Sequence, residues 1–325
     1  MKMHTAAALA LFLGLFFVNF TGQCYGALEY GFYNRKCGFL NVESMVSRLV
    51  AANFNQDKTT AAALLRLQFH DCFVNGCDAS ILLDGSSSEK TAPPNLSVRG
   101  YDIIDAIKTT LEFICPGVVS CADIIVMATR DAVSLSQGGR YEVQTGRRDG
   151  LVSLASNVNL PSPDFTVSQS INAFSQKNLS PTDMVYLLGG HTIGIAHCAF
   201  FQNRLYNFNN TGKPDPTMPA SLLAALMNTC PQNSASSGFA NLDQNPASAN
   251  IFDKSYYNQI LSRRGVLEID QELAQDPQTR GIVMAIASGN SFLTNFGNAM
   301  VKLGALEVLT GTQGEIRRSC RSVNS

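Results

Sequence analysis

Cysteine number and setting constrain this chain more than any other sequence feature. The 325 residues include nine cysteines, of which Cys24 lies in an N-terminal segment that we expect to be removed. Eight remain, at Cys37, Cys72, Cys77, Cys115, Cys121, Cys198, Cys230 and Cys320. An even number of cysteines in an exported chain indicates four disulfides, although eight cysteines allow about a hundred pairings. Zinc is the other common use of clustered cysteines, but the chain has no C-x2-C pair and no Cys/His quartet, so we favour disulfides.

The N-terminal 26 residues have the features of a secretory signal peptide. Lys2 and His4 precede an uncharged apolar run from Ala6 to Val18, and a small residue, Gly26, follows soon after. A run of about 13 residues is shorter than the roughly 20 that span a bilayer. A buried N-terminal helix is the alternative interpretation. We expect residues 1–26 to be removed and residues 27–325 to form a single exported domain with no later membrane segment.

Composition and charge exclude several functional classes. The chain is 45% apolar and 15% charged, with a formal net charge of −1 at pH 7. That apolar content is too high for a disordered chain. Binding to nucleic acid or to anionic lipid depends on clustered Lys and Arg, which a balanced charge does not favour. We therefore expect a compact globular protein that binds neither nucleic acid nor a membrane.

Hydrophobic residues recur with the period of an α-helix over most of the chain. Apolar stripes of this kind run through residues 42–50, 103–114 and 125–133. Residues 180–188 begin with Ser, Pro and, at the third helical position, an acid, as the start of a capped helix does. Strand-like alternation is scarce, and Tyr141–Thr145 is the best short candidate. The sequence predicts a single, mainly α-helical domain with room for two lobes.

Histidine is scarce after the signal segment, where only His70, His191 and His197 remain. Arg66 and His70 are four residues apart, so on a helix their side chains point to the same side. A guanidinium beside an imidazole lowers the pKa of the imidazole, so His70 would stay neutral and able to accept a proton. Arg66 would also stabilise a nearby oxyanion. The alternative is a structural cation next to a hydrogen-bonded core histidine.

The second histidine lies in a glycine-rich stretch, Leu188-Gly189-Gly190-His191-Thr192-Ile193-Gly194. We expect Gly189 and Gly190 to end the preceding helix, and the glycines to let a flat molecule lie close to the backbone. His191 has no acidic neighbour in sequence, so a partner for its second nitrogen would come from elsewhere in the fold. A plain loop histidine is the alternative. His197 is best interpreted as an exposed or disulfide-packed residue.

Oxygen ligands occur together in a ten-residue stretch. Two carboxylates, a hydroxyl, backbone carbonyls and a turn glycine come from Asp71, Val74, Gly76, Asp78 and Ser80. Such a set suits Ca²⁺, although the spacing is not that of an EF-hand. A solvated acidic turn is the alternative, and the adjacent Cys72 and Cys77 would brace either structure.

Several ordered motifs closely resemble those of the secretory, class III plant peroxidases. The longest is RLQFHDCFVNGCDAS at residues 66–80, which resembles the distal haem motif of that family. Others follow in the family's order: VSCAD at 119–123, GRRD at 146–149, LP at 160–161, GGHTIG at 189–194 and DQEL at 270–273. Together they cover roughly residues 28–322. A resemblance of this length and order is highly specific.

The resemblance implies a mainly α haem peroxidase fold of about ten helices in two lobes, with minimal β-structure and one haem b per chain between the lobes. His191 would be the axial ligand of the haem iron, and Asp270 would accept a hydrogen bond from its second nitrogen. The family's distal catalytic residues fall on Arg66, Phe69, His70 and Asn95, with Glu89 behind Asn95.

The implied activity is that of a peroxidase. H₂O₂ is reduced to water while phenolic donors are oxidised by one-electron steps near a haem edge shaped by Pro161 and Phe200. Lignin precursors, other cell-wall phenolics, suberin units and auxin are compatible donors, and peroxide removal under oxidative stress is a compatible role. We expect a secreted, monomeric glycoprotein of the cell wall rather than of the vacuole. Sequons for N-glycosylation occur at Asn95, Asn178 and Asn209.

The resemblance also implies two Ca²⁺ ions per chain and a disulfide pairing. The distal ion would bind the oxygen cluster at residues 71–80. The proximal ion would bind Thr192, Asp243, Ser248, Ile251 and Asp253, where the spacing to Asp253 is two residues longer than usual. The disulfides would be Cys37–Cys115, Cys72–Cys77, Cys121–Cys320 and Cys198–Cys230.

Two other functional classes remain as alternatives. A secreted hydrolase with one His, a Ser and an Asp would need a nucleophile motif such as G-x-S-x-G, which the chain lacks. A non-catalytic secreted haem- or Ca²⁺-binding wall protein is the other, because a fold does not guarantee activity. Haem content separates the first from a peroxidase, and peroxide turnover separates the second.

Overall fold

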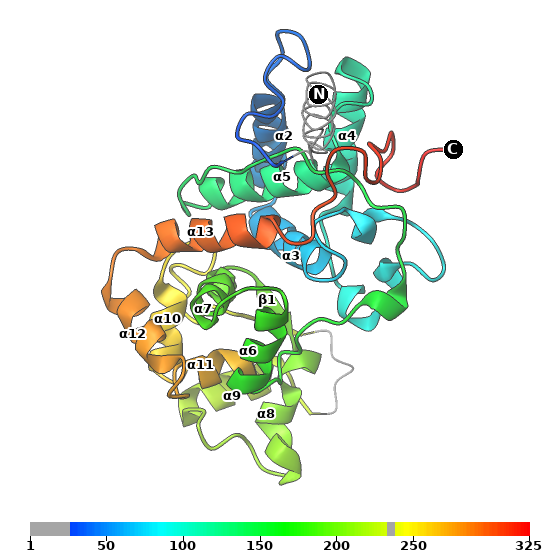
Figure 1. Ribbon diagram of the computed structural model, residues 1–325. Helices are drawn as coiled ribbons and strands as arrows, with labels where there is room; N and C mark the ends of the chain where they lie inside the picture. The colour runs from blue at the N-terminus through cyan, green and yellow to red at the C-terminus, as the bar shows by residue number, and fades with distance from the viewer. Residues whose placement is uncertain (1–26, 233–237) are drawn as a thin grey trace, which may run out of the picture.

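The structure is a computed structural model that describes residues 27–232 and 238–325, and α-helices predominate in it (Figure 1). The expected signal peptide, residues 1–26, lies outside the described residues. None of the helices within them is long and apolar enough to cross a membrane.

Four helices of the first half of the chain form the first lobe: α2 (Val42–Gln56), α3 (Thr60–Cys72), α4 (Tyr101–Ile114) and α5 (Cys121–Leu135). Helix α5 is its core, because all residues from Cys121 to Val133 are buried and α2, α3 and α4 all contact it. The hydroxyl of Ser120 caps α5 by accepting a hydrogen bond from the backbone N–H of Asp123. The helical stripes predicted at 42–50, 103–114 and 125–133 are confirmed in α2, α4 and α5.

Seven helices form the second lobe: α6 (Val167–Gln176), α7 (Pro181–Leu188), α8 (Gln202–Tyr206), α9 (Ala220–Thr229), α10 (Ser255–Leu261), α11 (Glu268–Leu273) and α12 (Arg280–Ser288). The last helix, α13 (Phe292–Gly304), returns to contact α7 of this lobe and α3 of the first. The part of the chain that the structure describes thus has twelve α-helices, close to the ten that the resemblance implies.

Helix α7 leads directly into the second histidine. Its N-terminus has the predicted capping box, in which Ser180 and Asp183 bond to each other's backbone N–H, with Pro181 at the first helical position. The α-helix ends at Leu188, but Gly189 keeps right-handed helical angles, with φ −60°. The chain then continues as a 3-10 turn, η5 (Gly189–Thr192), so the expectation that the glycines stop the helix was only partly correct.

The β-structure of the described residues is one small antiparallel pair, β1 (Ile195–His197) with β2 (Phe239–Asn241). Ala196 and Ala240 face each other on the buried side, and His197 pairs with Phe239 on the exposed side. The strand predicted at Tyr141–Thr145 was wrong. That segment has no strand alongside it, and only Thr145 forms a bridge, to Glu29.

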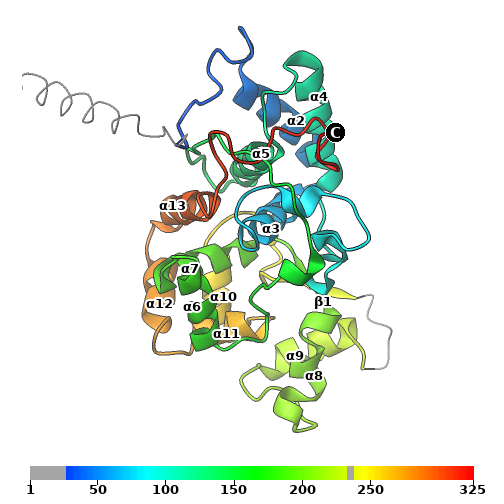
Figure 2. The ribbon, with the colours of Figure 1, turned by 45° about the vertical axis from the view of Figure 1, so that its right-hand side comes forward.

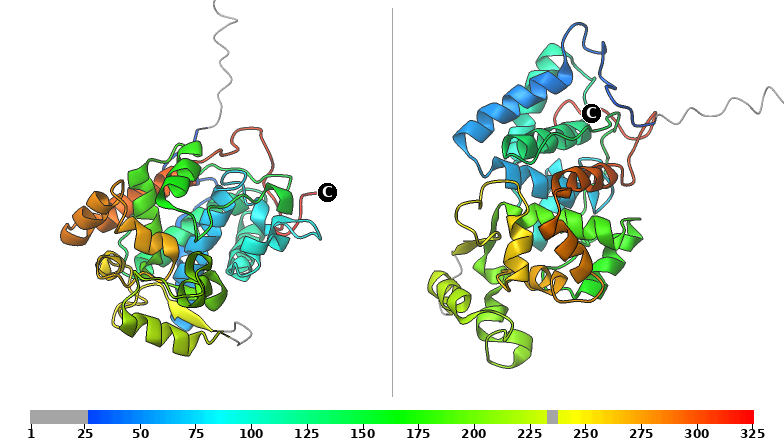
Figure 3. Two further views of the ribbon diagram at one scale, coloured as in Figure 1. Left: turned by 90° about the horizontal axis from the view of Figure 1, so that it is seen from below. Right: turned by 90° about the vertical axis from the view of Figure 1, so that its left-hand side faces the viewer.

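Four disulfides tie the chain together: Cys37–Cys115, Cys72–Cys77, Cys121–Cys320 and Cys198–Cys230. These are the pairs that the resemblance implies. The bond from Cys320 fastens the C-terminal segment to the start of α5, and Figures 2 and 3 show the C-terminus beside the first lobe. Arg317 of this segment is fully buried and donates to the backbone oxygens of Ala79 and Gly150, so the C-terminus is built into the first lobe.

Candidate active site

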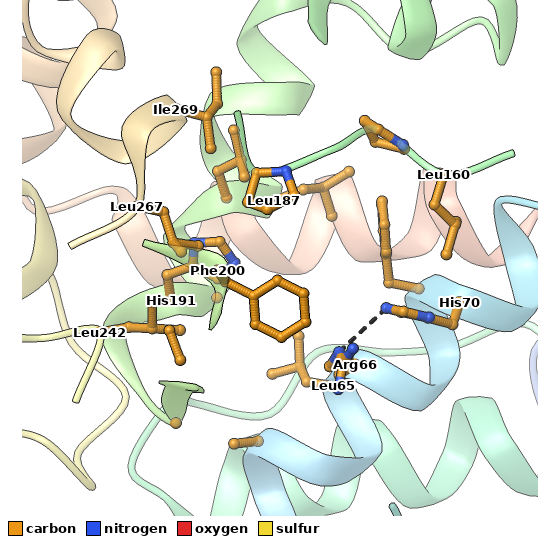
Figure 4. A pocket seen from close by; sticks show the side chains of 18 of the residues that line it. Leu65, Arg66, His70, Leu160, Leu187, His191, Phe200, Leu242, Leu267 and Ile269 are labelled. Carbon is orange, nitrogen blue, oxygen red and sulfur yellow. Dashed lines mark hydrogen bonds between the residues drawn. The ribbon is translucent and has the colours of Figure 1, made fainter. Parts of the chain in front are cut away.

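A cavity of about 300 Å³ lies where α3 of the first lobe meets the segment from α7 to β1 (Figure 4). Apolar side chains from both lobes form most of its wall, among them Leu65, Phe69, Phe174, Leu188, Leu242 and Ile269. A concave, mainly apolar space with a few polar groups is typical of a small-molecule or cofactor site. The polar groups include Arg66, His70 and Ser97 on one side and His191 on the other, and Figure 4 shows His70 and His191 across the cavity from each other.

Helix α3 presents Arg66 and His70 to the cavity from successive turns, as their spacing predicts. The Nε of Arg66 donates to Nε2 of His70 at 3.2 Å. The other ring nitrogen, Nδ1, lies 2.6 Å from Oδ1 of Asn95. Because an amide oxygen can only accept, His70 carries its proton on Nδ1 and is neutral. Burial, and then the charge of Arg66, lower the pKa of His70 to about 3.

Asn95 is held by the residue that the resemblance places behind it, but through the backbone. Its Nδ2 donates to the main-chain oxygen of Glu89 at 2.8 Å. The carboxylate of Glu89 points elsewhere and accepts from Nδ2 of Asn75 at 3.0 Å. Burial, followed by the charge of Asp78, raises the pKa of Glu89 to about 7, although its hydrogen bonds oppose this. The Glu89 side chain therefore belongs to the oxygen cluster rather than to the His70 network.

The guanidinium of Arg66 has further partners at the cavity wall. Nη1 donates to Oγ of Ser97 at 3.0 Å and Nη2 to the backbone oxygen of Pro94 at 2.9 Å. Burial lowers the pKa of Arg66, but a guanidinium remains charged in proteins. Sequence reasoning missed Ser97, although its position two residues after Asn95 was a usable signal.

On the opposite wall, His191 is held by an acid from a distant part of the chain. Its Nδ1 lies 2.8 Å from Oδ1 of Asp270, which is fully buried in α11. The hydroxyl of Tyr256 donates to the same oxygen at 2.8 Å. Burial lowers the pKa of His191, but the charge of Asp270 and its hydrogen bond outweigh that effect and raise it. With Nδ1 engaged, Nε2 is the nitrogen available to the cavity.

Burial and Asp270 both raise the pKa of Tyr256 well above that of a free tyrosine, so its hydroxyl stays protonated as a donor. Nothing in the sequence around Tyr256 signals this contact, because it depends on how α10 packs against α11. Tyr256 is the second residue of the site that sequence reasoning missed.

The two carboxylates of the oxygen cluster are buried, one in the last turn of α3 and the other in the loop after it. Asp71 and Asp78 are 1% and 6% exposed, and the pKa of each carboxyl is raised, chiefly by burial. Oδ1 of Asp71 and Oγ of Ser80 are buried and have no hydrogen-bond partner among the described residues. Buried polar atoms are nearly always satisfied, so these free oxygens fit a cation ligand set.

The second predicted oxygen set also comes together. The hydroxyl of Thr192 donates to Oδ1 of Asp253 at 3.2 Å, and that of Ser248 to Oδ2 of Asp243 at 2.7 Å. Burial is the main reason that the pKa of Asp253 is raised, and the nearby charge of Asp243 adds to it. Both oxygens of Asp243 already accept protein hydrogen bonds, since Ser255 donates to Oδ1. This set differs from the first because none of its side-chain oxygens is both buried and without a hydrogen-bond partner among the described residues.

The remaining predicted site residues lie at the cavity wall. Pro161 and Phe200 line it, and Phe200 is 40% exposed, which places it at the mouth. His197 also lines the cavity and is exposed, in agreement with the prediction of an exposed or disulfide-packed residue. Asn95 and Asp270 do not line the cavity but back the two histidines that do.

Comparisons with known proteins agree with this geometry. A family model described as peroxidase matches residues 46–289. Peroxidase 60 of Arabidopsis thaliana is 55% identical over 324 residues, which cover 99% of this chain and 97% of the relative. Peroxidase 57 of the same plant is 49% identical over 323 residues, covering 99% and 100%. Peroxidase N1 of Nicotiana tabacum is 46% identical over 300 residues, covering 90% of each chain.

The chain belongs to the class III plant peroxidase family. It is therefore a haem enzyme that uses H₂O₂ to oxidise a reducing substrate, and the resemblance drawn from its motifs is confirmed. The non-catalytic alternative is not supported. The cavity fits a haem, because its walls are apolar and an imidazole on one side has its second nitrogen anchored to a buried carboxylate.

Proposed function

We propose that this peroxidase binds one haem b in the cavity between α3 and His191 and oxidises phenolic donors by one-electron steps. Haem, when bound, would supply the iron and the two electrons that cleavage of the O–O bond requires, and would recover those electrons one at a time from the donor. The proposal rests on two histidines that face each other across the cavity. His70 is kept neutral by its hydrogen bonds, and Asp270 makes the imidazole of His191 electron-rich.

In this mechanism His70 moves a proton between the two oxygens of peroxide. Its neutral Nε2 faces the cavity and, in place of its contact with Nε of Arg66, accepts the proton of the oxygen nearer to His191. It then delivers that proton to the outer oxygen, which leaves as water. Asn95 holds Nδ1, so the ring cannot rotate or change tautomer during the transfer.

Arg66 stabilises the charge that develops as the outer oxygen departs. Ser97 and Pro94 fix two of its nitrogens, so the charge is placed before the reaction begins. Phe69 covers the cavity wall beside His70, and Pro161 with Phe200 shapes the opening at which a phenolic ring would meet the haem edge.

We also propose two Ca²⁺ ions per chain. The distal ion would bind Asp71, Val74, Gly76, Asp78 and Ser80, and the proximal ion would bind Thr192, Asp243, Ser248, Ile251 and Asp253. The orphaned oxygens of Asp71 and Ser80 support the first site. The contact of Thr192 with Asp253, across 61 residues, supports the second. We further propose that the mature chain works as a monomer in the cell wall after loss of residues 1–26.

The role of His70 is tested by replacing it with leucine. We expect His70→Leu to bind haem as before but to react with H₂O₂ slower by about 10²–10⁴-fold or more, because no group then moves the proton. Stopped-flow absorbance of the Soret band, with equal haem content as the control, measures this rate. An unchanged rate would remove His70 from the mechanism, and a protein that takes up no haem at all would refute the proposed function.

A further inference from the structure

One buried carboxylate oxygen serves both His191 and a tyrosine. Oδ1 of Asp270 accepts from Nδ1 of His191 and from the hydroxyl of Tyr256, each at 2.8 Å. Asp270 and Tyr256 are both fully buried. The other oxygen, Oδ2, is buried and has no hydrogen-bond partner among the described residues. The two donors therefore compete for one oxygen while its neighbour stays free.

Competition of this kind weakens the hydrogen bond to the histidine. An acceptor that already takes one strong hydrogen bond has less negative charge to offer a second donor, and the effect is larger where water is excluded. The carboxylate behind a metal-bound histidine controls how electron-rich the imidazole is. A hydroxyl on the same oxygen therefore makes His191 a poorer electron donor than Asp270 alone would make it.

We propose that Tyr256 is a positioning residue that limits the electron donation of His191 to the haem iron, by sharing the acceptor oxygen of Asp270. The inference rests on the proposed function, because it takes His191 as the axial ligand. It concerns the third member of the array, His191–Asp270–Tyr256, which neither the motifs nor the family comparison assigns.

The surroundings of Tyr256 fix its hydroxyl in this position. Its ring meets that of His191 edge-on, at 87° and with 6.1 Å between ring centroids. The next residue of α10, Tyr257, donates to the backbone oxygen of Val185 in α7 at 2.9 Å. Helix α10 is thus bonded to α11 through Tyr256 and to α7 through Tyr257.

Replacement of Tyr256 by phenylalanine tests the proposal. In the haem-loaded protein, Tyr256→Phe should lower the iron(III)/iron(II) midpoint potential and raise the iron–histidine stretching frequency of the reduced form. Both shifts follow because Oδ1 of Asp270 then accepts from His191 alone. Spectroelectrochemistry and resonance Raman spectroscopy measure them without reference to turnover.

Tyr257→Phe is the matched control. It removes a buried hydroxyl and one hydrogen bond from the same helix, but that bond goes to Val185 rather than to Asp270. The control should lose stability without moving either the potential or the frequency. Equal values in wild type, Tyr256→Phe and Tyr257→Phe, or equal shifts in both variants, would overturn the proposal.

A second substitution tests the same proposal if Tyr256→Phe does not fold. A 3-fluorotyrosine at position 256 retains the hydroxyl and makes it a stronger donor, so the potential should rise instead of fall, and no shift would count against the proposal. Failure of the proposed function has a different signature. Haem-loaded wild type would then lack an iron–histidine band altogether.

Discussion

The state of His70 is set by its immediate neighbours. A free histidine titrates near pH 6.5, but burial and the Arg66 guanidinium lower the pKa of His70 to about 3. A catalytic base acts only in its neutral form, so this environment keeps His70 able to accept a proton at pH values well below 6.5. Placing a cation and an imidazole in an apolar wall costs free energy. The hydrogen bonds of Arg66 to Ser97 and Pro94 offset this cost.

A pH profile of peroxide cleavage follows from this. The second-order rate constant should stay flat well below pH 6.5 and fall only as the pH approaches about 3, where His70 becomes protonated. In Arg66→Leu the charge is gone and only burial lowers the pKa, so the fall should begin at higher pH, though still below 6.5. Stopped-flow pH jumps measure both profiles.

Arg99→Leu is the control for that profile. Arg99 is exposed and pairs with Asp57 rather than with any cavity residue, so its loss should leave the acid limb in place. If the wild-type rate constant already fell near pH 6.5, the lowered pKa of His70 would be contradicted.

At the scale of elements, the junction of α7 with η5 positions the second histidine. Gly189 has ordinary helical angles, so its lack of a side chain is a matter of space rather than of backbone freedom. A Cβ there would lie 2.2 Å from the hydroxyl oxygen of Tyr257 and 2.7 Å from Cε2 of Phe292. The close approach of α10 to this junction therefore depends on a glycine.

Gly189→Ala should lower the free energy of unfolding by about 1–3 kcal/mol, because the added methyl group overpacks the α7–α10 contact. The double variant Gly189→Ala/Tyr257→Phe should cost less than the sum of the two single changes, since the nearest clashing atom is removed. Denaturant unfolding of the four proteins measures this cycle.

Gly281→Ala is the matched control for Gly189→Ala. Gly281 also lies in a helix, α12, but a Cβ there would meet nothing within 4 Å. Its replacement should leave stability unchanged or raise it by up to about 1 kcal/mol. Equal stability of Gly189→Ala and wild type would contradict the prediction, because it would show that the α7–α10 contact shifts to accommodate the methyl group at no cost.

At the scale of the whole molecule, one oxygen set lies in each lobe. The distal set is enclosed by the first lobe and the C-terminal segment, through the bonds of Arg317 to Ala79 and Gly150. The proximal set joins η5 to the loop before α10 through Thr192 and Asp253. Loss of an ion would thus loosen a different lobe in each case.

Chelation should remove the two proposed Ca²⁺ ions in order, the proximal one first. Asp243 keeps hydrogen bonds from Ser248 and Ser255 without a metal, whereas Asp71 and Ser80 would be left with buried, unsatisfied oxygens. Titration with EGTA followed by metal analysis should show two steps in wild type.

Single variants assign the two steps. Asp253→Asn should lack the first step and keep the second, while Asp78→Asn should show the reverse. Simultaneous loss of both ions in every protein, or the opposite order, would contradict the assignment.

The sequence predicts local geometry well and distant partnerships poorly. The contact of Arg66 with His70 follows from helix spacing alone, and the cap of Ser180 from the four adjacent residues 180–183. His191 and Asp270 are 79 residues apart, and only the family resemblance joined them in advance.

Contacts made by packing were beyond both kinds of reasoning. Tyr256 reaches Asp270 because α10 crosses α11, and Asn95 bonds to the backbone of Glu89 rather than to its side chain. The alternation at Tyr141–Thr145 suggested a strand, but alternation reports which side chains are buried and not whether a second strand lies alongside.

The disulfide between Cys121 and Cys320 has a consequence for biosynthesis. A chain emerges from the ribosome N-terminus first, so Arg317 and Cys320 appear only after the helices of both lobes. Yet the first lobe needs both residues. Cys320 forms the disulfide with Cys121 at the start of α5, and Arg317 donates hydrogen bonds to Ala79 and Gly150. The half of the protein that is made first therefore cannot finish folding until the second lobe has been made as well.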